Sequence, residues 1–354
     1  MSPSPVKVKL KSGSRRKFGR KKAKARKPLG RGGKMVLLLM GILALWVAIW
    51  WGVQSVKRQM LAGRILEVNV DGEFFGPGDD PGRFKEPWGV CVGPNDTLYV
   101  SDFGNGRVQK FNQDGQLLQV IGAKGNDKDQ KPGTFNQPTG IYVDPAGFLY
   151  VCDTFFHRIQ KFDAQGKFIK TWSHGFFGPR GITGDAQGHL YVTDTGNHKV
   201  QVFDQDGNFL SEWGAGGRSD AVGRFEEPNG IVAGSDGFVY VADTENRRIE
   251  KFDGAGKFKA AFKVEPWLGK CCEVPYLAIG PTGLYTTNAS ANSVLRLDPQ
   301  TGKLLAIYRK KGELKDGGFS YAAGIALDSG GRVWVVEKSV GKVVRFTPPM
   351  LNGR

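Results

Sequence analysis

The sequence predicts an all-β protein, a six-bladed β-propeller, preceded by one transmembrane helix. Two observations predict this organisation. The first is a string that returns four times with little change: YVSDFGNGRVQKFN at 99–112, YVCDTFFHRIQKFD at 150–163, YVTDTGNHKVQVFD at 191–204 and YVADTENRRIEKFD at 240–253. The second is an uncharged run at 35–53, MVLLLMGILALWVAIWWGV, which follows a strongly basic N-terminus.

The repeats have the spacing of propeller blades. The aspartate of the string falls at 102, 153, 194 and 243, at intervals of 51, 41 and 49 residues. Two weaker copies follow, at 285–298 with Asn288 in the aspartate position and at 334–347 with Glu337 there. A period of about 40–50 residues with four short strands in each unit is typical of a β-propeller.

Each copy also has the residue pattern of β-strands. Apolar and polar residues alternate, β-branched and aromatic types are frequent, and glycine turns separate the short runs. A single four-stranded sheet cannot bury both of its faces, whereas a ring of such sheets can. The need for burial therefore explains why the string recurs.

Six copies are recognised, and the last one is incomplete. They span 84–122, 135–173, 177–214, 225–262, 273–308 and 319–347. The last copy stops after its third strand. RILEVNVDGEFF at 64–75 resembles RVQKFNQDGQLL at 107–118, so we expect 64–75 to close the ring against the last unit and to protect its open edge. The propeller would then occupy 64–349, with a short C-terminal tail at 350–354.

The N-terminal residues predict a membrane anchor. Residues 1–34, a basic tail expected to be disordered, hold fourteen Lys or Arg and no Asp or Glu. An apolar run of about 20 residues crosses the roughly 30 Å hydrocarbon layer as a helix, which we place at 35–56, with a linker at 57–63. A cleaved or twin-arginine signal fits less well, because no A-x-A site follows. Only three basic residues flank the far end, so the positive-inside rule places the tail in the cytoplasm and the propeller on the periplasmic or extracellular side.

The net charge of +16 belongs to this anchor region and not to the propeller. Residues 1–64 hold 17 of the 50 basic residues, which leaves 33 basic against 34 acidic residues in the rest of the chain. The propeller is therefore about neutral, and nucleic-acid binding through a basic face is not expected of it. The tail itself has two open interpretations, a solvated topogenic segment or contact with anionic lipid or nucleic acid.

The repeated string resembles the NHL repeat. The resemblance implies a six-bladed propeller, and it leaves the activity open because this family includes receptors, RNA binders and at least one enzyme. We expect a binding module for a protein, peptide or cell-envelope ligand, without a cofactor. The alternative is an extracytoplasmic lyase or lactonase-like hydrolase with a metal-assisted site at the channel mouth.

The strand order predicts where a ligand would bind. The turns between second and third strands share a face with the connections between blades, which are long and irregular at 76–87, 123–138 and 214–228. Variable loops on a rigid scaffold often carry function. The residue before the glycine of each first strand should ring the channel mouth there, and these residues are Trp88, Thr139, Arg180, Asn229, Pro275 with Tyr276, and Ala323. Such a mouth suits a small anionic or polar ligand, or the residues merely fill the channel.

The repeated acids are expected to be structural. Four identical placements, each five residues before a basic residue, favour a carboxylate that holds a turn together over a catalytic set. The pairs are Asp102 with Arg107, Asp153 with Arg158, Asp194 with Lys199, and Asp243 with Arg248.

The cysteines and histidines predict no metal site. The four histidines do not fall on the mouth positions, unlike the histidine set that holds the metal of the peptide-amidating lyase with similar repeats. Of the Glu, Asn and Asp ligands of calcium in lactonase-like propellers, only Asn229 has a counterpart. Cys91 and Cys152 are expected as buried thiols, and the adjacent Cys271 and Cys272 as a vicinal disulfide in an oxidising compartment.

Overall fold

The computed structural model describes residues 64–126, 130–214, 216–265, 267, 274–312 and 318–350, and ten residues between Leu39 and Trp51. The chain divides into two compact units, Met1–Met60 and Leu61–Arg354. The tail 1–34, the linker 57–63, the last residues 351–354 and the Cys271–Cys272 pair lie outside the described residues, as does much of 35–56. The predictions made for these segments stay predictions.

In the N-terminal unit, the described residues between Leu39 and Trp51 are helical. Their apolar side chains are exposed, with Leu43 at 66% and Trp46 at 67%. Over the part of the chain that the structure describes, no helix combines the length and the apolar character needed to cross a membrane.

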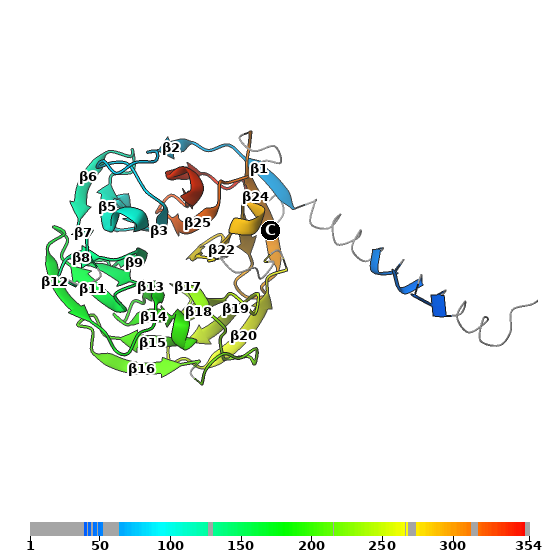
Figure 1. The fold of residues 1–354 in the computed structure, drawn as a ribbon. Coiled ribbons are helices and arrows are strands. Elements are labelled where there is room, and N and C mark those ends of the chain that lie inside the picture. The colour runs from blue at the N-terminus through cyan, green and yellow to red at the C-terminus, as the bar shows by residue number, and fades with distance from the viewer. Residues whose placement is uncertain are drawn as a thin grey trace, which may run out of the picture. The chain divides into compact units, whose positions relative to one another are not determined.

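Six sheets stand side by side in a ring and form the blades of a propeller, which Figure 1 shows along its axis. Blade 1 consists of β3 (Pro87–Val92), β4 (Leu98–Asp102), β5 (Arg107–Phe111) and β6 (Leu117–Ile121). Blades 2 to 4 repeat this order with β9 (Pro138–Val143), β10 (Leu149–Asp153), β11 (Arg158–Phe162) and β12 (Phe168–Trp172); β13 (Pro179–Gly184), β14 (Leu190–Asp194), β15 (Lys199–Phe203) and β16 (Phe209–Trp213); and β17 (Pro228–Ala233), β18 (Phe238–Asp243), β19 (Arg248–Asp253) and β20 (Phe258–Lys263). The prediction of an all-β six-bladed propeller is confirmed.

The last two blades use strands from both ends of the propeller. Blade 5 contains β21 (Leu277–Gly280), β22 (Gly283–Asn288), β23 (Ser293–Leu297) and β24 (Leu304–Lys310), and blade 6 contains β25 (Ala322–Leu327), β26 (Val333–Glu337) and β27 (Lys342–Phe346). The outer strand of blade 6 is β2 (Gly72–Phe74), antiparallel to β27. A strand not expected from the repeats, β1 (Ile65–Val68), adds to blade 5 in parallel with β24.

Segment 64–75 thus divides between two blades, whereas the sequence comparison placed all of it against the last unit. Its first half resembles a third strand, RVQKF, but β23 already occupies that place in blade 5 and β27 in blade 6. Main-chain pairing to the free edge of β24 is the remaining way to satisfy the backbone groups of 65–68. The N-terminal segment therefore ties blade 5 to blade 6.

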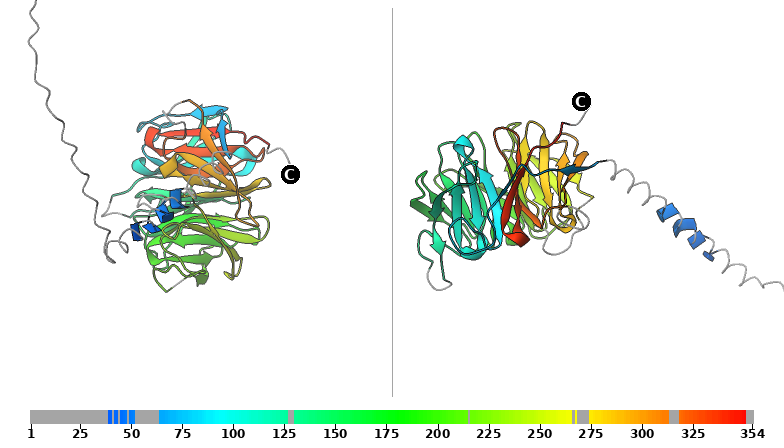
Figure 2. Two further views of the ribbon diagram at one scale, coloured as in Figure 1. Left: turned by 90° about the vertical axis from the view of Figure 1, so that its right-hand side faces the viewer. Right: turned by 90° about the horizontal axis from the view of Figure 1, so that it is seen from above.

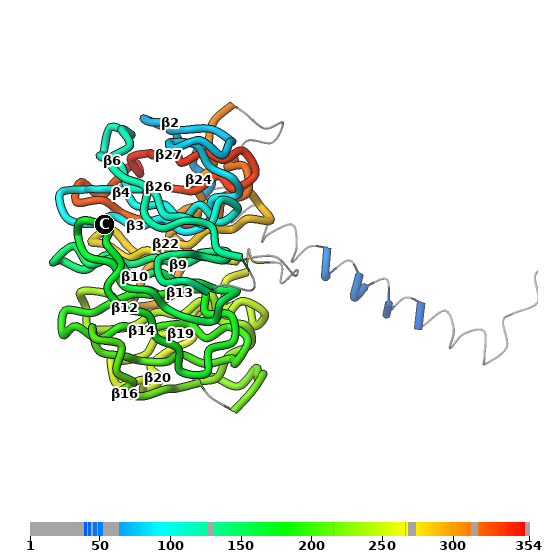
Figure 3. The backbone as a smooth tube through the Cα atoms, turned by 60° about the vertical axis from the view of Figure 1, so that its left-hand side comes forward, coloured from blue at the N-terminus to red at the C-terminus, as the bar shows by residue number. Residues whose placement is uncertain are grey.

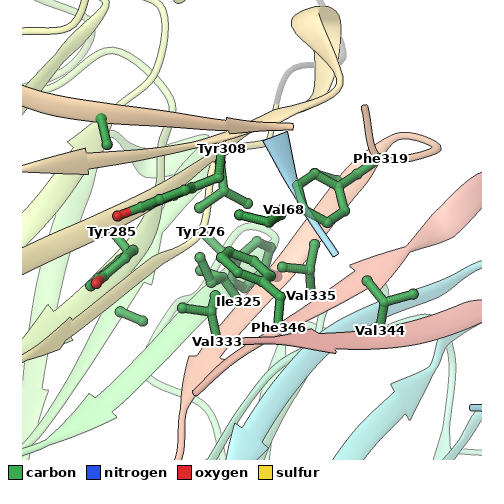
Figure 4. Close-up of a cluster of buried hydrophobic side chains, with 14 of the residues drawn as sticks. Val68, Tyr276, Tyr285, Tyr308, Phe319, Ile325, Val333, Val335, Val344 and Phe346 are labelled. Atoms are coloured by element: carbon green, nitrogen blue, oxygen red, sulfur yellow. The ribbon is translucent and has the colours of Figure 1, made fainter. Parts of the chain in front are cut away.

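The core lies between the blades. Inner faces of neighbouring sheets bury Tyr150, Tyr191, Tyr240, Tyr285 and Tyr308, each at 0% exposure. Figure 4 shows one of these clusters, in which Val68 of β1 lies among Tyr308, Phe319 and Phe346 from blades 5 and 6. Because each cluster draws on more than one blade, no single sheet can complete its own core.

The repeated acids hold each blade to the connection before it. In four blades the carboxylate accepts a hydrogen bond from the backbone N–H seventeen residues earlier, at 2.7–2.8 Å, and the pairs are Lys85 with Asp102, Asn136 with Asp153, Phe177 with Asp194, and Glu226 with Asp243. The same bond runs from Ser320 to Glu337. Arg107, Arg158 and Arg248 add ion pairs of 2.7–2.8 Å.

Blade 3 departs from the expected pairing. The ammonium of Lys199 binds Glu212 at 2.6 Å and not Asp194. The Asp194 carboxylate is already satisfied by the side-chain amides of Asn197 and Gln201, each at 2.7 Å. The pair Asp194–Lys199 predicted from the sequence is therefore wrong, although the carboxylate still ties the turn to the connection.

The turns after the second strands lie on the same face as the connections between blades. Gly104 N–H donates to Lys85 O at 2.8 Å, and Gly196 N–H donates to Phe177 O at 2.9 Å. We call this side of the ring the connection face; Figure 2 and Figure 3 show the propeller from the side. The connection between blades 1 and 2 carries its own parallel pair, β7 (Ala123–Lys124) with β8 (Thr134–Phe135).

Candidate functional site

The structure brings the predicted mouth residues together at the centre of the connection face. Thr139 Oγ1 donates to Arg180 O at 3.1 Å, and Tyr276 Oη donates to the same carbonyl oxygen at 3.3 Å. Arg180 Nη1 donates to Asn229 Oδ1 at 3.2 Å. Residues from blades 2, 3, 4 and 5 therefore form one hydrogen-bonded layer across the channel.

This layer is closed. Thr139 and Asn229 are 2% exposed and Tyr276 is 8% exposed, and burial raises the pKa of the Tyr276 hydroxyl. A cavity of about 230 Å³ occupies the channel beyond the layer, with Val90, Ile141 and Tyr276 among its lining residues. Thr139, Asn229 and Tyr276 therefore fill the mouth of the channel. Of the predicted ligand-binding residues, only Trp88 and Arg180 keep accessible surface.

Trp88 is covered by the chain's own lysine. Its ring stacks on Phe103 with 4.9 Å between centroids. Lys338 Nζ lies 3.8 Å from the Trp88 centroid and 5.5 Å from that of Tyr321. This cation–π contact joins blade 6 to blade 1 and leaves Arg180 as the mouth residue best placed to meet a ligand.

A pocket of about 380 Å³ opens beside Arg180 on the connection face. Its walls come from the turns after the second strands of blades 2 and 3, from the connections that precede blades 3 and 4, and from the start of β13. The lining residues used below are Phe155, His157, Phe177, Arg180, Gly196 and Glu227. Phe155 and Phe177 are each 59% exposed. We call this site the Phe155–Phe177 pocket.

Both neighbouring blades fix the backbone of Phe177. Its N–H donates to Asp194 Oδ1 at 2.7 Å, and the N–H of Gly178 donates to His157 Nδ1 at 2.9 Å. The Phe177 ring also lies against Gly196, where any Cβ would come within 2.1 Å of the ring. The exposed ring is thus held in place before any ligand arrives.

The sequence does contain a signal for this pocket, which lies in differences between the repeats. At the position of Phe155, five other copies have small or polar residues: Gly104, Gly196, Glu245, Ser290 and Ser339. At the position of Phe177, the copies before the other repeated acids have Lys85, Asn136, Glu226 and Ser320. The blade framework therefore does not require either phenylalanine.

His157 supplies a first prediction. It adopts φ 51°, and Asn292 occupies the matching position of blade 5 at φ 49° and accepts a hydrogen bond from Tyr321 N–H at 3.2 Å. His157→Asn should keep both the left-handed backbone and the acceptor, so its unfolding free energy should stay within about 0.5 kcal/mol of the parent. His157→Val should lose about 1–2 kcal/mol, because a β-branched residue is strained at this φ and leaves Gly178 N–H unpaired. Urea unfolding followed by circular dichroism measures both, and equal losses would contradict the role of Nδ1.

The repeats of blades 1 to 4 match a known repeat type. The NHL repeat pattern matches residues 84–111, 135–162, 176–203 and 225–252, one segment in each of blades 1 to 4. The chain is an NHL-repeat six-bladed β-propeller. The prediction that the repeated string is an NHL repeat in a six-bladed propeller is therefore confirmed.

The alignments with known relatives cover only part of this NHL-repeat propeller and only part of each relative. Mouse NHL repeat-containing protein 3 is 33% identical over 126 residues, which make up 34% of this chain and 35% of that protein. Mouse peptidyl-glycine alpha-amidating monooxygenase is 32% identical over 113 residues, 31% of this chain and 12% of that protein. The chain thus spans about a third or less of these curated relatives. A solved streptogramin B lyase superposes with a TM-score of 0.57 at 15% identity, covering 78% of this chain and 96% of the lyase, which shows the shared fold alone.

The mouth does not offer a divalent metal a suitable oxygen set. Asn229 donates through Nδ2 to Glu227 O and to Thr244 Oγ1, and its remaining oxygen accepts from the Arg180 guanidinium. A cation placed there would face that positive charge. No group of three or more His, Cys, Asp or Glu with metal-site geometry occurs among the residues described. Cys91 and Cys152 are free thiols whose pKa values burial raises, so they are poor nucleophiles and metal ligands.

Proposed function

We propose that this protein is a membrane-anchored binding module that displays its propeller outside the cytoplasm and holds a protein or peptide partner on the connection face. The observation that carries the proposal is the Phe155–Phe177 pocket, in which two exposed phenylalanines occupy positions that are small or polar in the other repeats. Exposed aromatic rings fixed on a rigid scaffold are typical of protein-binding hot spots. The single-pass anchor with the N-terminus in the cytoplasm is supported by the 35–53 run and the charge asymmetry around it.

A second candidate is an extracytoplasmic propeller enzyme, a lyase or a lactonase-like hydrolase. The names of two similar proteins favour it, since one is an amidating monooxygenase and the other a streptogramin B lyase. The blocked mouth and the Asn229–Arg180 contact favour the binding module instead. Metal analysis of the purified full chain separates the two candidates, because a stoichiometric zinc or calcium ion would favour the enzyme.

Selection from a phage-displayed peptide library tests the binding module. The full chain in detergent should enrich peptides that no longer bind Phe177→Ala but still bind Leu118→Ala, a control at an exposed apolar residue of β6. Failure to enrich any peptide, or equal binding to both variants, would refute the proposed site. Protease protection in membranes tests the topology: digestion of the propeller from the cytosolic side would overturn the orientation and reopen RNA binding.

A further inference from the structure

The charge of the Phe155–Phe177 pocket points to the chemistry of its partner. Arg180 is the one basic residue among the six mouth positions, and its side chain binds only the neutral amide oxygen of Asn229 among the described residues. The arginines of the neighbouring turns differ, because Arg158 and Arg248 are neutralised by Asp153 and Asp243. A partly exposed guanidinium without a carboxylate beside it favours an anionic ligand group.

The other charged groups around the pocket do not neutralise Arg180. Glu227 also lines the pocket, but its carboxylate lies 3.4 Å from Arg218 on the blade 3–4 connection. His157 uses Nδ1 as the acceptor for Gly178 N–H. The pocket thus combines two apolar rings with the guanidinium of Arg180. The carboxylate of Glu227 contacts Arg218, which also pairs with Glu226 at 3.2 Å.

We infer that the Phe155–Phe177 pocket binds a partner-protein segment in which a bulky apolar side chain is followed closely by an internal aspartate or glutamate. The apolar side chain packs between Phe155 and Phe177, and the carboxylate accepts hydrogen bonds from the guanidinium of Arg180. This inference rests on the proposed function and adds the sequence type that the site selects.

The size of the pocket agrees with one anchoring side chain. A volume of about 380 Å³ lies at the small end of the range for ligand pockets, roughly 300–1,000 Å³. It holds a side chain of a bound segment and leaves the neighbouring residues of that segment over the connection face. The carboxylate then meets Arg180, which lies between the pocket and the filled mouth.

A peptide array on the full chain tests the inference directly. The probes are peptides blocked at both ends, with one phenylalanine fixed and one aspartate placed at each of the four following positions; the block removes any terminal carboxylate. We expect binding in at least one spacing, with affinity falling at least tenfold when the aspartate is replaced by asparagine or the phenylalanine by alanine. Arg180→Gln should weaken the aspartate peptide at least tenfold and leave the asparagine peptide unchanged, whereas Arg83→Gln, an exposed arginine of the same face, should change neither.

Three outcomes would overturn the inference. They are no binding in any spacing, equal affinity for aspartate and asparagine peptides, and equal effects of Arg180→Gln and Arg83→Gln. If phage selection still yields peptides that depend on Phe177 but lack an acidic residue, the binding module stands and the acidic specificity is wrong. If selection yields nothing, both proposals fall. Melting temperatures of Arg180→Gln and Phe177→Ala within a few degrees of the parent exclude unfolding as the cause.

Discussion

Replacing residues 64–75 by a Gly/Ser segment of equal length should abolish the cooperative unfolding of the propeller. The replacement removes β2 from the edge of β27 and β1 from the edge of β24. It also removes Phe75, whose ring lies 4.1 Å from that of Phe111, and Glu73, which pairs with Lys310 and Lys342 at 2.5 and 3.1 Å. We expect a loss above about 5 kcal/mol, comparable with the roughly 5–15 kcal/mol that stabilises an ordinary domain.

Thermal unfolding of the full chain, followed by near-ultraviolet circular dichroism, measures this effect. Leu118→Ser on the exposed outer strand of blade 1 provides the control and should melt like the parent, because its side chain is already 53% exposed. A replaced chain with an unchanged cooperative transition would show that the ring is stable without its N-terminal clasp, and the interpretation of 64–75 as a closing segment would be lost.

The sequence was sufficient for the blades because their pattern is local. The period of the aspartate string, the strand alternation and the glycine turns all fall within one repeat, so they predict six blades without knowledge of contacts. The pairing of β1 with β24 was not predictable in this way, because RILEV resembles a third strand and only the occupied place of β23 excludes that role. Lys199 was misassigned for a similar reason: its repeat position suggests Asp194, while its actual partner, Glu212, lies on the next strand.

The sequence predicted where the mouth residues lie, but not which of them are accessible to a ligand. The strand order correctly grouped Thr139, Arg180, Asn229 and Tyr276, but it did not show that Tyr276 reaches the Arg180 carbonyl and fills the channel. The reach of a side chain across the ring depends on contacts between blades, which the pattern of a single repeat does not encode. Phe155 and Phe177 were not predicted, because the site prediction rested on residues that the repeats share, whereas at these two positions the repeats differ.

Glu250 is another residue at which one repeat departs from its neighbours. The matching residues of blades 1 to 3 are Gln109, Gln160 and Gln201, whose amides donate to the repeated aspartates at 3.1, 3.1 and 2.7 Å. In blade 4 an ionised Glu250 has no proton to donate to Asp243. Burial raises the Glu250 pKa to about 7, with Asp243 adding to the effect and Arg248, 3.0 Å from Glu250, opposing it.

Glu250→Gln should therefore stabilise the propeller, and the gain should depend on pH. The carboxyl ionises near its ordinary value in the unfolded chain and only near pH 7 in the folded one, so the folded state holds the extra proton between these values. The contribution of Glu250 to the free energy of unfolding consequently falls as pH rises from about 4.5 to about 7, and then stays level. The glutamine removes this loss, so its advantage should be small near pH 4.5 and reach about 2 kcal/mol above pH 7, with allowance for screening. Asp153, whose pKa burial raises to about 6, is present in both chains and cancels. Asp243 interacts with Glu250, so the comparison reports the titration of this pair.

The reverse substitution in blade 3 gives the matched comparison. Gln201→Glu places a second carboxylate beside Asp194, and no arginine compensates there because Lys199 pairs with Glu212. Its destabilisation should grow over the same pH range and should exceed the gain from Glu250→Gln. Urea unfolding of the parent and both variants at pH 4.5, 6 and 8 measures the difference. A Glu250→Gln advantage that is constant across this range would mean that Glu250 is ionised throughout in the folded protein, with Arg248 and the Gly223 N–H supplying enough stabilisation to keep it so.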